Sequence, residues 1–220
     1  MTILKEVLLI ATFLTSCFNL YAYEKGQITL GLGAVYSPLE IGTEWGEVNV
    51  DDTTEGASHD AKLGKPGIGG ELQALYFWNK YVGTGISFSD QYFARDLSSG
   101  WYVYNHARMQ NYMAVGHIFL TPDSSFKLYI PLGLGAAHTV YTKDFSTQGD
   151  RKYHFSYTGF ACYIGMGVEK SFSSHWSLGL ETRYNSNRFH DSSTRRNGNH
   201  ITVYPRGNFV SLIVRAIYVL

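Results

Sequence analysis

The chain has 220 residues, a length that suits one domain, and its 18 basic and 18 acidic side chains give a formal net charge of zero. This balance argues against a nucleic-acid partner, which calls for a clustered basic surface. Charged residues make up 16% of the chain, and 23 Gly and 17 Tyr are present. No apolar run reaches the about 20 residues that a membrane-spanning helix needs. If the chain spans a membrane, it is therefore expected to do so as a β-barrel.

Residues 1–22 are predicted to be an export signal. Lys5 supplies the positive end, and the apolar core runs from Val7 to Leu14. Small residues follow, and Ala22 completes a cleavage site of the kind that ends secretory signals. Residues 23–220 are then expected to form the mature outer-membrane domain.

A second processing route stays open for the same segment. The sequence Leu14-Thr15-Ser16-Cys17 resembles a lipoprotein site, which would leave a lipidated Cys17. Because a barrel is already held in the bilayer by its own apolar belt, ordinary cleavage is the favoured route. It leaves Cys162 as the one cysteine of the mature chain, so no internal disulfide is expected.

The mature chain is predicted to contain eight strands, because apolar and small side chains alternate with a period of two between polar segments. An even number of strands is typical of bacterial outer-membrane barrels. One segment, residues 109–120, is apolar on both faces, so its phase stays open. The predicted strands are residues 28–36, 71–78, 82–89, 109–120, 128–137, 159–169, 176–184 and 210–220.

The face that points outward separates two kinds of eight-stranded barrel. A soluble barrel of the lipocalin type fills its interior with apolar side chains and shows Lys and Glu outside. Here one face of nearly every strand is apolar, and the other consists of Gly and Ser with a few Glu, Gln and Arg, which suits a narrow, crowded interior. The apolar face is therefore expected to meet lipid. The predicted fold class is an all-β, transmembrane, antiparallel up-and-down barrel.

Short and long connections alternate along the chain, as in outer-membrane barrels with short periplasmic turns and long extracellular loops. The short turns are predicted at residues 78–81, 121–125 and 171–174. The long polar stretches are Leu39–Pro66, Asp90–Arg108, Thr142–His154 and Asn185–Asn208.

Aromatic residues beside both kinds of connection are expected to form girdles at the two membrane interfaces. The girdle at the short turns is predicted to contain Trp78, Tyr81, His175 and Trp176. The girdle at the long loops is predicted to contain Tyr36, Tyr92, Tyr141 and Tyr184.

Three short motifs lie in the later predicted strands, at Leu132–Ala136, Gly165–Lys170 and Trp176–Tyr184. They resemble the small outer-membrane barrels of the OmpA, OmpX and opacity-protein type, and at the level of pattern the resemblance covers the mature chain. It implies an eight-stranded barrel in the outer membrane of a Gram-negative-type bacterium. The family usually ends in an aromatic residue, whereas this chain ends in Leu220, which keeps the lipid-facing phase.

A few charged residues lie on the face of the strands that is predicted to point into the barrel. Glu71, Glu181, Arg183 and Arg215 are predicted to point into one narrow lumen, with Glu169 and Gln73 as further candidates. Buried charges are tolerated when they are paired and hydrogen-bonded, and a guanidinium can satisfy two carboxylate oxygens at once. The favoured interpretation is a charge network that plugs the barrel. An ion pathway gated by switching pairs, and a pair of carboxylates acting as acid and base, are the alternatives.

A lipid A-modifying hydrolase is the least favoured function. The segment Arg183–Asn187 looks like part of the lipid A deacylase motif of the PagL type, where a His two residues before the Ser activates it. Tyr184 stands in that position and cannot act as a general base at neutral pH. No Glu follows Glu181 to serve as the acidic partner, and His190 would help only if the loop folded back onto Ser186. We therefore predict no catalytic residues.

The remaining polar residues suggest no cofactor and no metal site. The eight His are dispersed without metal-ligand spacing and are expected at surfaces or interfaces. The first long connection is acidic and the fourth is basic, with Arg188, Arg195 and Arg196 at its centre. These loops either dock together or leave the basic one free to bind lipopolysaccharide phosphates or an anionic glycan.

The sequence thus predicts a monomeric barrel with a structural or surface-interaction role of an adhesion-like kind. Outer-membrane lipid and lipopolysaccharide are its expected surroundings, and an extracellular ligand would bind through the long loops. A narrow, porin-like ion channel is the first alternative.

Overall fold

A computed structural model describes residues 22–40, 49–50, 66–95, 104–145, 151–190, 192–196, 199–203 and 206–220. Within them the chain forms strands separated by turns. No helix among these residues is long and apolar enough to cross a membrane. The strands are β1 (Ile28–Glu40), β2 (Asn49–Val50), β3 (Gly67–Asn79), β4 (Val82–Arg95), β5 (Tyr104–Phe119), β6 (Phe126–Phe145), β7 (Arg151–Ser171), β8 (Trp176–Phe189), β9 (Ser192–Arg196), β10 (Asn199–Val203) and β11 (Arg206–Val219).

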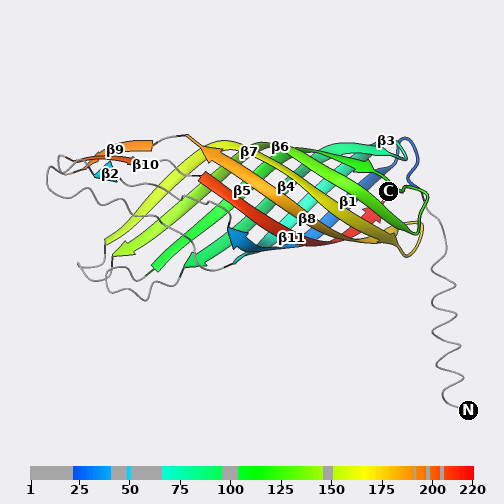
Figure 1. Cartoon of the computed structure of the whole chain (residues 1–220), viewed down its shortest axis with the longest axis horizontal. Helices are drawn as coiled ribbons and strands as arrows, with labels where there is room; N and C mark the ends of the chain where they lie inside the picture. Colours follow the sequence, from blue (N-terminus) through cyan, green and yellow to red (C-terminus); the bar gives the residue numbers. More distant parts are fainter. Residues whose placement is uncertain are drawn as a thin grey trace, which may run out of the picture.

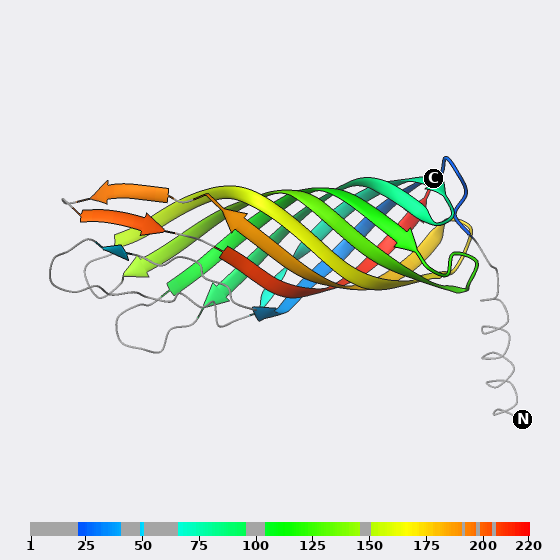
Figure 2. The same cartoon turned by 45° about the horizontal axis from the view of Figure 1, so that its top comes forward.

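Eight of these strands close into one antiparallel barrel (Figures 1 and 2), in the order β1-β11-β8-β7-β6-β5-β4-β3. The first and last strands pair directly, from Thr29 opposite Val219 to Glu40 opposite Phe209. Closure leaves no free edge, so every strand finds backbone partners on both sides. The prediction of an all-β, eight-stranded, up-and-down barrel is confirmed.

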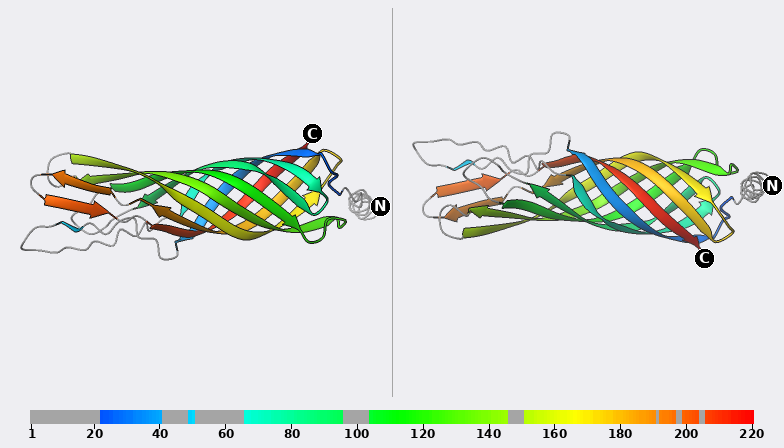
Figure 3. Two further views of the ribbon diagram at one scale, coloured as in Figure 1. Left: turned by 90° about the horizontal axis from the view of Figure 1, so that it is seen from above. Right: turned by 90° about the horizontal axis from the view of Figure 1, so that it is seen from below.

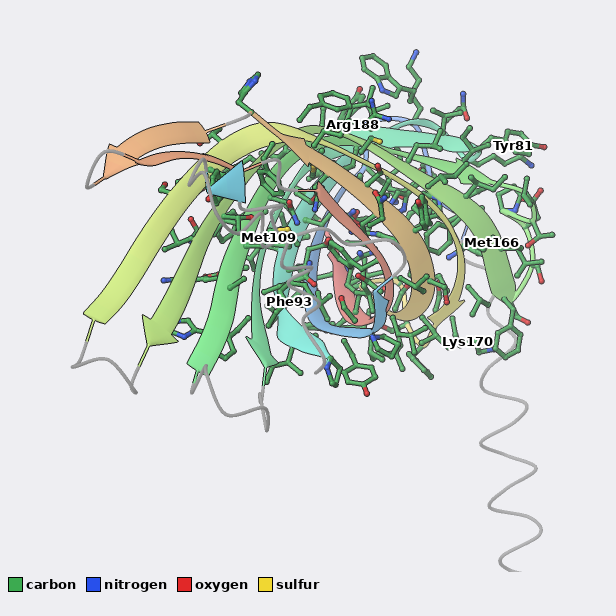
Figure 4. The ribbon with its side chains drawn as sticks, turned by 60° about the vertical axis from the view of Figure 1, so that its left-hand side comes forward. Tyr81, Phe93, Met109, Met166, Lys170 and Arg188 are labelled. Atoms are coloured by element: carbon green, nitrogen blue, oxygen red, sulfur yellow. The ribbon has the colours of Figure 1, made fainter. Side chains whose placement is uncertain are left out.

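The apolar face of the barrel points outward, as predicted. Leu32, Ile86 and Met166 are 65%, 69% and 72% exposed on the outer wall. Phe93 and Met109 are fully buried inside the ring of strands, and Figure 4 shows them there, with Met166 on the outside. The outer wall is therefore the lipid-facing surface, and the packed interior is the lumen.

The phase of β5, which the sequence left open, is decided by the structure. Its odd-numbered residues point into the lumen, where Met109, Met113 and Val115 are buried. Tyr112 and Ile118 point outward and are half exposed. Both faces carry apolar residues because this strand also supplies hydrophobic packing inside the barrel.

The short turns gather at one end of the barrel together with the C-terminus, and the strand ends that lead into the long connections lie at the other (Figures 1 and 3). The tightest turn is fixed by Asn79, whose Oδ1 accepts hydrogen bonds from the backbone N–H groups of Tyr81 at 2.8 Å and Val82 at 3.0 Å. An Asn in this position replaces a backbone carbonyl and favours chain reversal. We call the two ends the turn end and the loop end.

Aromatic side chains lie on the outer wall near both ends. Trp78, Tyr81 and Trp176 are about half exposed at the turn end, and Tyr36, Tyr92 and Tyr184 are similarly exposed on the loop side. His175 is exposed beside Trp176. The side chain of Tyr141 lies outside the described residues. These positions agree with the two predicted girdles.

The strands run further than the sequence predicted. The predicted loops Asp90–Arg108 and Thr142–His154 are largely strand, because β4 continues to Arg95 and β6 continues to Phe145, which pairs with Arg151. The strands β6 and β7 have 20 and 21 residues, whereas about 9–11 residues cross a bilayer. Outside the lipid, polar side chains on the outer face are compatible with strand pairing. The loop-end part of the β6–β7 hairpin therefore extends beyond the membrane.

The first and fourth long connections are joined by a small sheet at the loop end. The strand β10 pairs with β9, and it also pairs with β2, where Ile201 lies opposite Val50 and Thr202 opposite Asn49. Figure 1 shows this sheet beyond the barrel, at the end opposite the C-terminus. Backbone pairing therefore brings the first and fourth long connections together. Docking of these two connections was one of the two interpretations that the sequence left open. The predicted export signal lies outside the described residues, apart from Ala22.

Candidate functional site in the barrel lumen

Four charged side chains from three strands meet in the middle of the lumen. Glu71 comes from β3, Glu181 and Arg183 from β8, and Arg215 from β11, and all four are at most 3% exposed. The structure thus brings together the four residues that the sequence predicted to face inward. We call them the lumen quartet.

Every carboxylate of the quartet contacts both guanidinium groups. Arg215 Nη2 lies 2.5 Å from Glu71 Oε1, and Arg215 Nη1 lies 3.2 Å from Glu181 Oε2. Arg183 donates through Nη1 and Nη2 to Glu71, the latter at 3.0 Å, and through Nε to Glu181. Two positive and two negative charges therefore cancel. Charge-assisted contacts of this kind are what makes burial of ions tolerable.

Small residues on neighbouring strands make room for the long arginine side chains. Arg215 lies beside β1, where Gly31 and Gly33 point inward. A Cβ added at Gly31 would stand 2.5 Å from Cδ of Arg215, closer than side-chain atoms pack. The glycine-rich inner face recognised in the sequence is thus the counterpart of the arginines.

Aromatic rings frame the quartet. The Tyr129 hydroxyl donates to Glu181 Oε2 at 2.9 Å, and its ring stacks on His117 with centroids 4.7 Å apart. The Tyr163 ring lies 4.1 Å from the centre of the Arg183 guanidinium, a cation–π contact. His117 is 3% exposed and lies 3.3 Å from Gln73. The expectation that all His lie at surfaces is therefore wrong for His117, because the phase of its strand could not be read.

A second ion pair lies nearer the turn end. Lys127 Nζ lies 3.6 Å from Glu169 Oε1 and donates to Ser171 Oγ at 2.5 Å. Glu169, which the sequence offered as a further member of the quartet, belongs to this pair instead. Sequence reasoning missed Lys127 because it follows a turn, although its spacing of two from Tyr129 places it on the inward face. The six buried charged side chains of the described residues comprise three anions and three cations.

Towards the loop end the lumen is filled by an amide and hydroxyl layer and then by aromatic rings. Ser37 Oγ lies 2.9 Å from Gln91 and 2.8 Å from Ser211, and Asn185 donates to the same Ser211 at 2.9 Å. Beyond this layer, Phe93 and Phe209 meet edge to face with centroids 5.4 Å apart. Apolar rings therefore close the interior above the polar groups.

Two small cavities lie inside the lumen among the described residues. One cavity beside Arg183 and Tyr163, and another beside His117 and Phe119, each have a volume of about 10 Å³. That volume is enough for about one water molecule. The quartet and its surroundings can fill the middle of the barrel and hold the strands in register.

Of the three arginines proposed for anion binding, Arg188 is the one whose side chain the structure describes. Arg188 is exposed on the outer wall near the end of β8 (Figure 4). Arg195 and Arg196 belong to β9, and their side chains lie outside the described residues. Among the described residues, no three His, Cys, Asp or Glu side chains cluster in a way that could hold a metal ion.

The hydrolase motif lies on the outer wall. Tyr184 and Ser186 both occupy outward positions of β8. The backbone N–H of His190 bonds to the carbonyl of Thr158 at 3.2 Å, which continues the ladder with β7. In an extended strand, four residues span about 13 Å, so His190 does not fold back onto Ser186.

Comparison with known proteins places the chain in a family. The model of the outer membrane protein beta-barrel domain matches residues 9–208, and the chain belongs to this family. It is accordingly a protein of the outer membrane of Gram-negative-type bacteria. No curated protein matches the sequence.

Solved structures share the fold at low sequence identity. The outer membrane protein OprG from Pseudomonas aeruginosa is 13% identical with a TM-score of 0.59, over 92% of this chain and 99% of that one. The attachment invasion locus protein Ail of Yersinia pestis and Neisserial surface protein A are each 12% identical, with TM-scores of 0.48 over 89% of this chain and 99% of theirs. The likeness to OprG supports the barrel fold alone.

Proposed function

We propose that this protein is a closed outer-membrane barrel with a structural or surface-interaction role, whose lumen is plugged by the quartet of Glu71, Glu181, Arg183 and Arg215. The observation that carries the proposal is the packed interior, where opposite charges cancel and cavities of about 10 Å³ remain. A water-filled pore would need a continuous path, which the quartet in the middle of the lumen and the Phe93–Phe209 contact at the loop end interrupt.

Conductance in planar bilayers tests the plug against the first alternative, a narrow ion channel gated by switching pairs. The refolded barrel is expected to give no single-channel steps. Replacing both arginines, as in Arg183→Ala with Arg215→Ala, removes the two longest side chains of the quartet and is expected to produce leak events. Steady conductance of the unaltered protein would establish the channel instead.

The surface-interaction part of the proposal is supported by what lies beyond the membrane. The β6–β7 hairpin and the β2–β10–β9 sheet both project at the loop end. Arg188, Arg195 and Arg196 are the proposed contacts to lipopolysaccharide phosphates. Binding should weaken with added salt, because salt screens exposed charges. Equal binding by a variant with all three changed to Gln would remove this role.

Two further parts of the proposal have direct tests. We infer a monomer without enzymatic activity. The mass of the protein in detergent micelles reports the oligomeric state. Release of fatty acid from labelled lipid A by the refolded barrel would overturn the non-enzymatic role, and a Ser186→Ala variant identifies the residue responsible.

A further inference from the structure

The segment just before β1 enters the turn end of the lumen. Tyr23 is 4% exposed, although it lies outside the strands, whereas Glu24 and Lys25 beside it are exposed. A single aromatic residue of a polar segment is thus buried inside the barrel. Its position cannot be explained by strand pairing, because the ladder of β1 begins at Ile28.

A tight turn directs this tyrosine inward. The Gln27 N–H bonds to the Glu24 carbonyl at 3.3 Å, and Gly26 between them has φ of 93°. That left-handed conformation at the third position is typical of a type II turn and favours glycine. The turn is tied to the barrel, since Gly26 N–H bonds to the Phe77 carbonyl at 2.8 Å and Phe77 N–H bonds to Gln27 at 2.9 Å.

The surroundings of the Tyr23 side chain match each part of a phenol. One ring face stacks on Phe77 with centroids 3.9 Å apart, and Phe119 meets the ring edge to face at 5.4 Å. The Lys127 ammonium lies 4.5 Å from the ring centroid. The hydroxyl donates to the Glu169 carboxylate. Apolar faces, a cation over the ring and an anionic acceptor for the hydroxyl are thus combined at one place.

We propose that Phe77, Phe119, Lys127 and Glu169 form a phenol-binding pocket at the turn end of the lumen, and that Tyr23 of the chain's own N-terminal segment occupies this pocket as a stopper. Tyr23 separates the Lys127–Glu169 pair from the aqueous side. Behind it lies the small cavity beside His117 and Gln73. The expected cleavage after Ala22 would make the stopper the first residue of the mature chain.

The stopper is independent of the plug under Proposed function, because the lumen quartet comes from other residues of β3, β8 and β11. Removing Tyr23 should therefore open the turn end of the lumen without making the barrel conduct. The two ideas can fail separately: conductance reports on the quartet, and access to Lys127 reports on the stopper.

The first measurement is melting of Tyr23→Ala in detergent with and without a small phenol. Truncating a buried aromatic residue is expected to lower the melting temperature by about 6–20 °C. Addition of p-cresol, which supplies the missing ring and hydroxyl, should restore much of the loss. Toluene, which lacks the hydroxyl, should restore less. Tyr81→Ala, at an exposed tyrosine of the same end, is the control and should respond to neither compound.

The second measurement is chemical access to Lys127, read by mass spectrometry after a brief treatment with a water-soluble amine reagent. Lys127 should be protected in the unaltered protein and in Tyr23→Phe, and it should become modified in Tyr23→Ala. Heat-modifiable gel migration shows that each variant has a closed barrel, and the milder truncation Tyr23→Leu, which also removes the ring, takes the place of Tyr23→Ala if the alanine variant does not fold. Equal modification of Lys127 in unaltered protein and Tyr23→Ala, or equal rescue by toluene and p-cresol, would overturn the proposal.

Discussion

Removal of one guanidinium from the lumen quartet provides the sharpest test of its energetic role. In Arg183→Ala the contacts to Glu71 and Glu181 are lost together, and so is the cation–π contact with Tyr163. Two carboxylates then share Arg215 alone, which leaves one uncompensated negative charge in the lumen. Breaking a buried pair by removing one partner costs about 3–5 kcal/mol. Since 1 kcal/mol shifts the melting temperature of a chain of this size by about 2–4 °C, the expected loss is about 6–20 °C.

The assay is the temperature at which the heat-modifiable gel band of the refolded barrel converts to the unfolded form. Arg188→Ala is the matched control, because it removes an exposed arginine from the same strand and is expected to leave the conversion temperature unchanged. A cycle of Glu71→Gln, Arg183→Gln and the double variant separates pairing from packing. The double variant removes one charge of each sign, so its loss should be smaller than the sum of the single losses. An unchanged conversion temperature in Arg183→Ala, or additive losses in the cycle, would refute the reasoning.

Three further predictions concern close packing, alkaline pH and the lipid face. Gly85→Ala should prevent or strongly slow refolding, because its Cβ would stand 1.8 Å from the backbone oxygen of Ala74, whereas Gly116→Ala on the neighbouring strand has no atom within 4 Å and should refold normally. Burial raises the pKa of Tyr23 well above its ordinary value of 10.0, and the Glu169 carboxylate adds to the shift. As the pH rises, the Tyr23 hydroxyl therefore loses its proton in the unfolded chain before it does so in the folded barrel. The stabilisation that the protonated hydroxyl contributes is complete below about pH 10 and is lost as the pH rises from there through the pKa of the folded state. Tyr23→Phe has no hydroxyl to ionise, so it should lose less stability in alkali than the unaltered protein. Leu134→Arg places a charge in the lipid-facing belt and should cost about 2–4 kcal/mol in a bilayer unfolding titration.

Each of these predictions has an outcome that contradicts it. Equal refolding yields of the two glycine variants would mean that the strands can separate enough to admit a methyl group. Parallel loss of stability in alkali would show that Tyr23 is ionised as easily in the fold as in the unfolded chain. An unchanged free energy of unfolding in Leu134→Arg would mean that residue 134 lies outside the hydrocarbon layer of the membrane.

The sequence alone determined the architecture, because each residue of a membrane barrel faces either lipid or lumen and the alternation records that choice. Leu32 and Ile86 fall on one face and Glu71 and Arg215 on the other, so the orientation of seven strands and the charged interior could be predicted. In β5 the same rule gave no answer, because Met113 and Val115 pack inside the barrel and are as apolar as the residues outside.

Closure and stagger of the sheet decided the rest. The cation that an inward carboxylate meets depends on the position of the carboxylate along the barrel axis. Glu169 therefore pairs with Lys127, whereas Glu71 and Glu181 share the two arginines of the quartet. The position of Tyr23 follows from a turn outside the alternating pattern. The local alternation of residues predicts whether a side chain points to the lipid or to the lumen. The partner of that side chain comes from a strand far away in the sequence, and only the tertiary structure brings the two together.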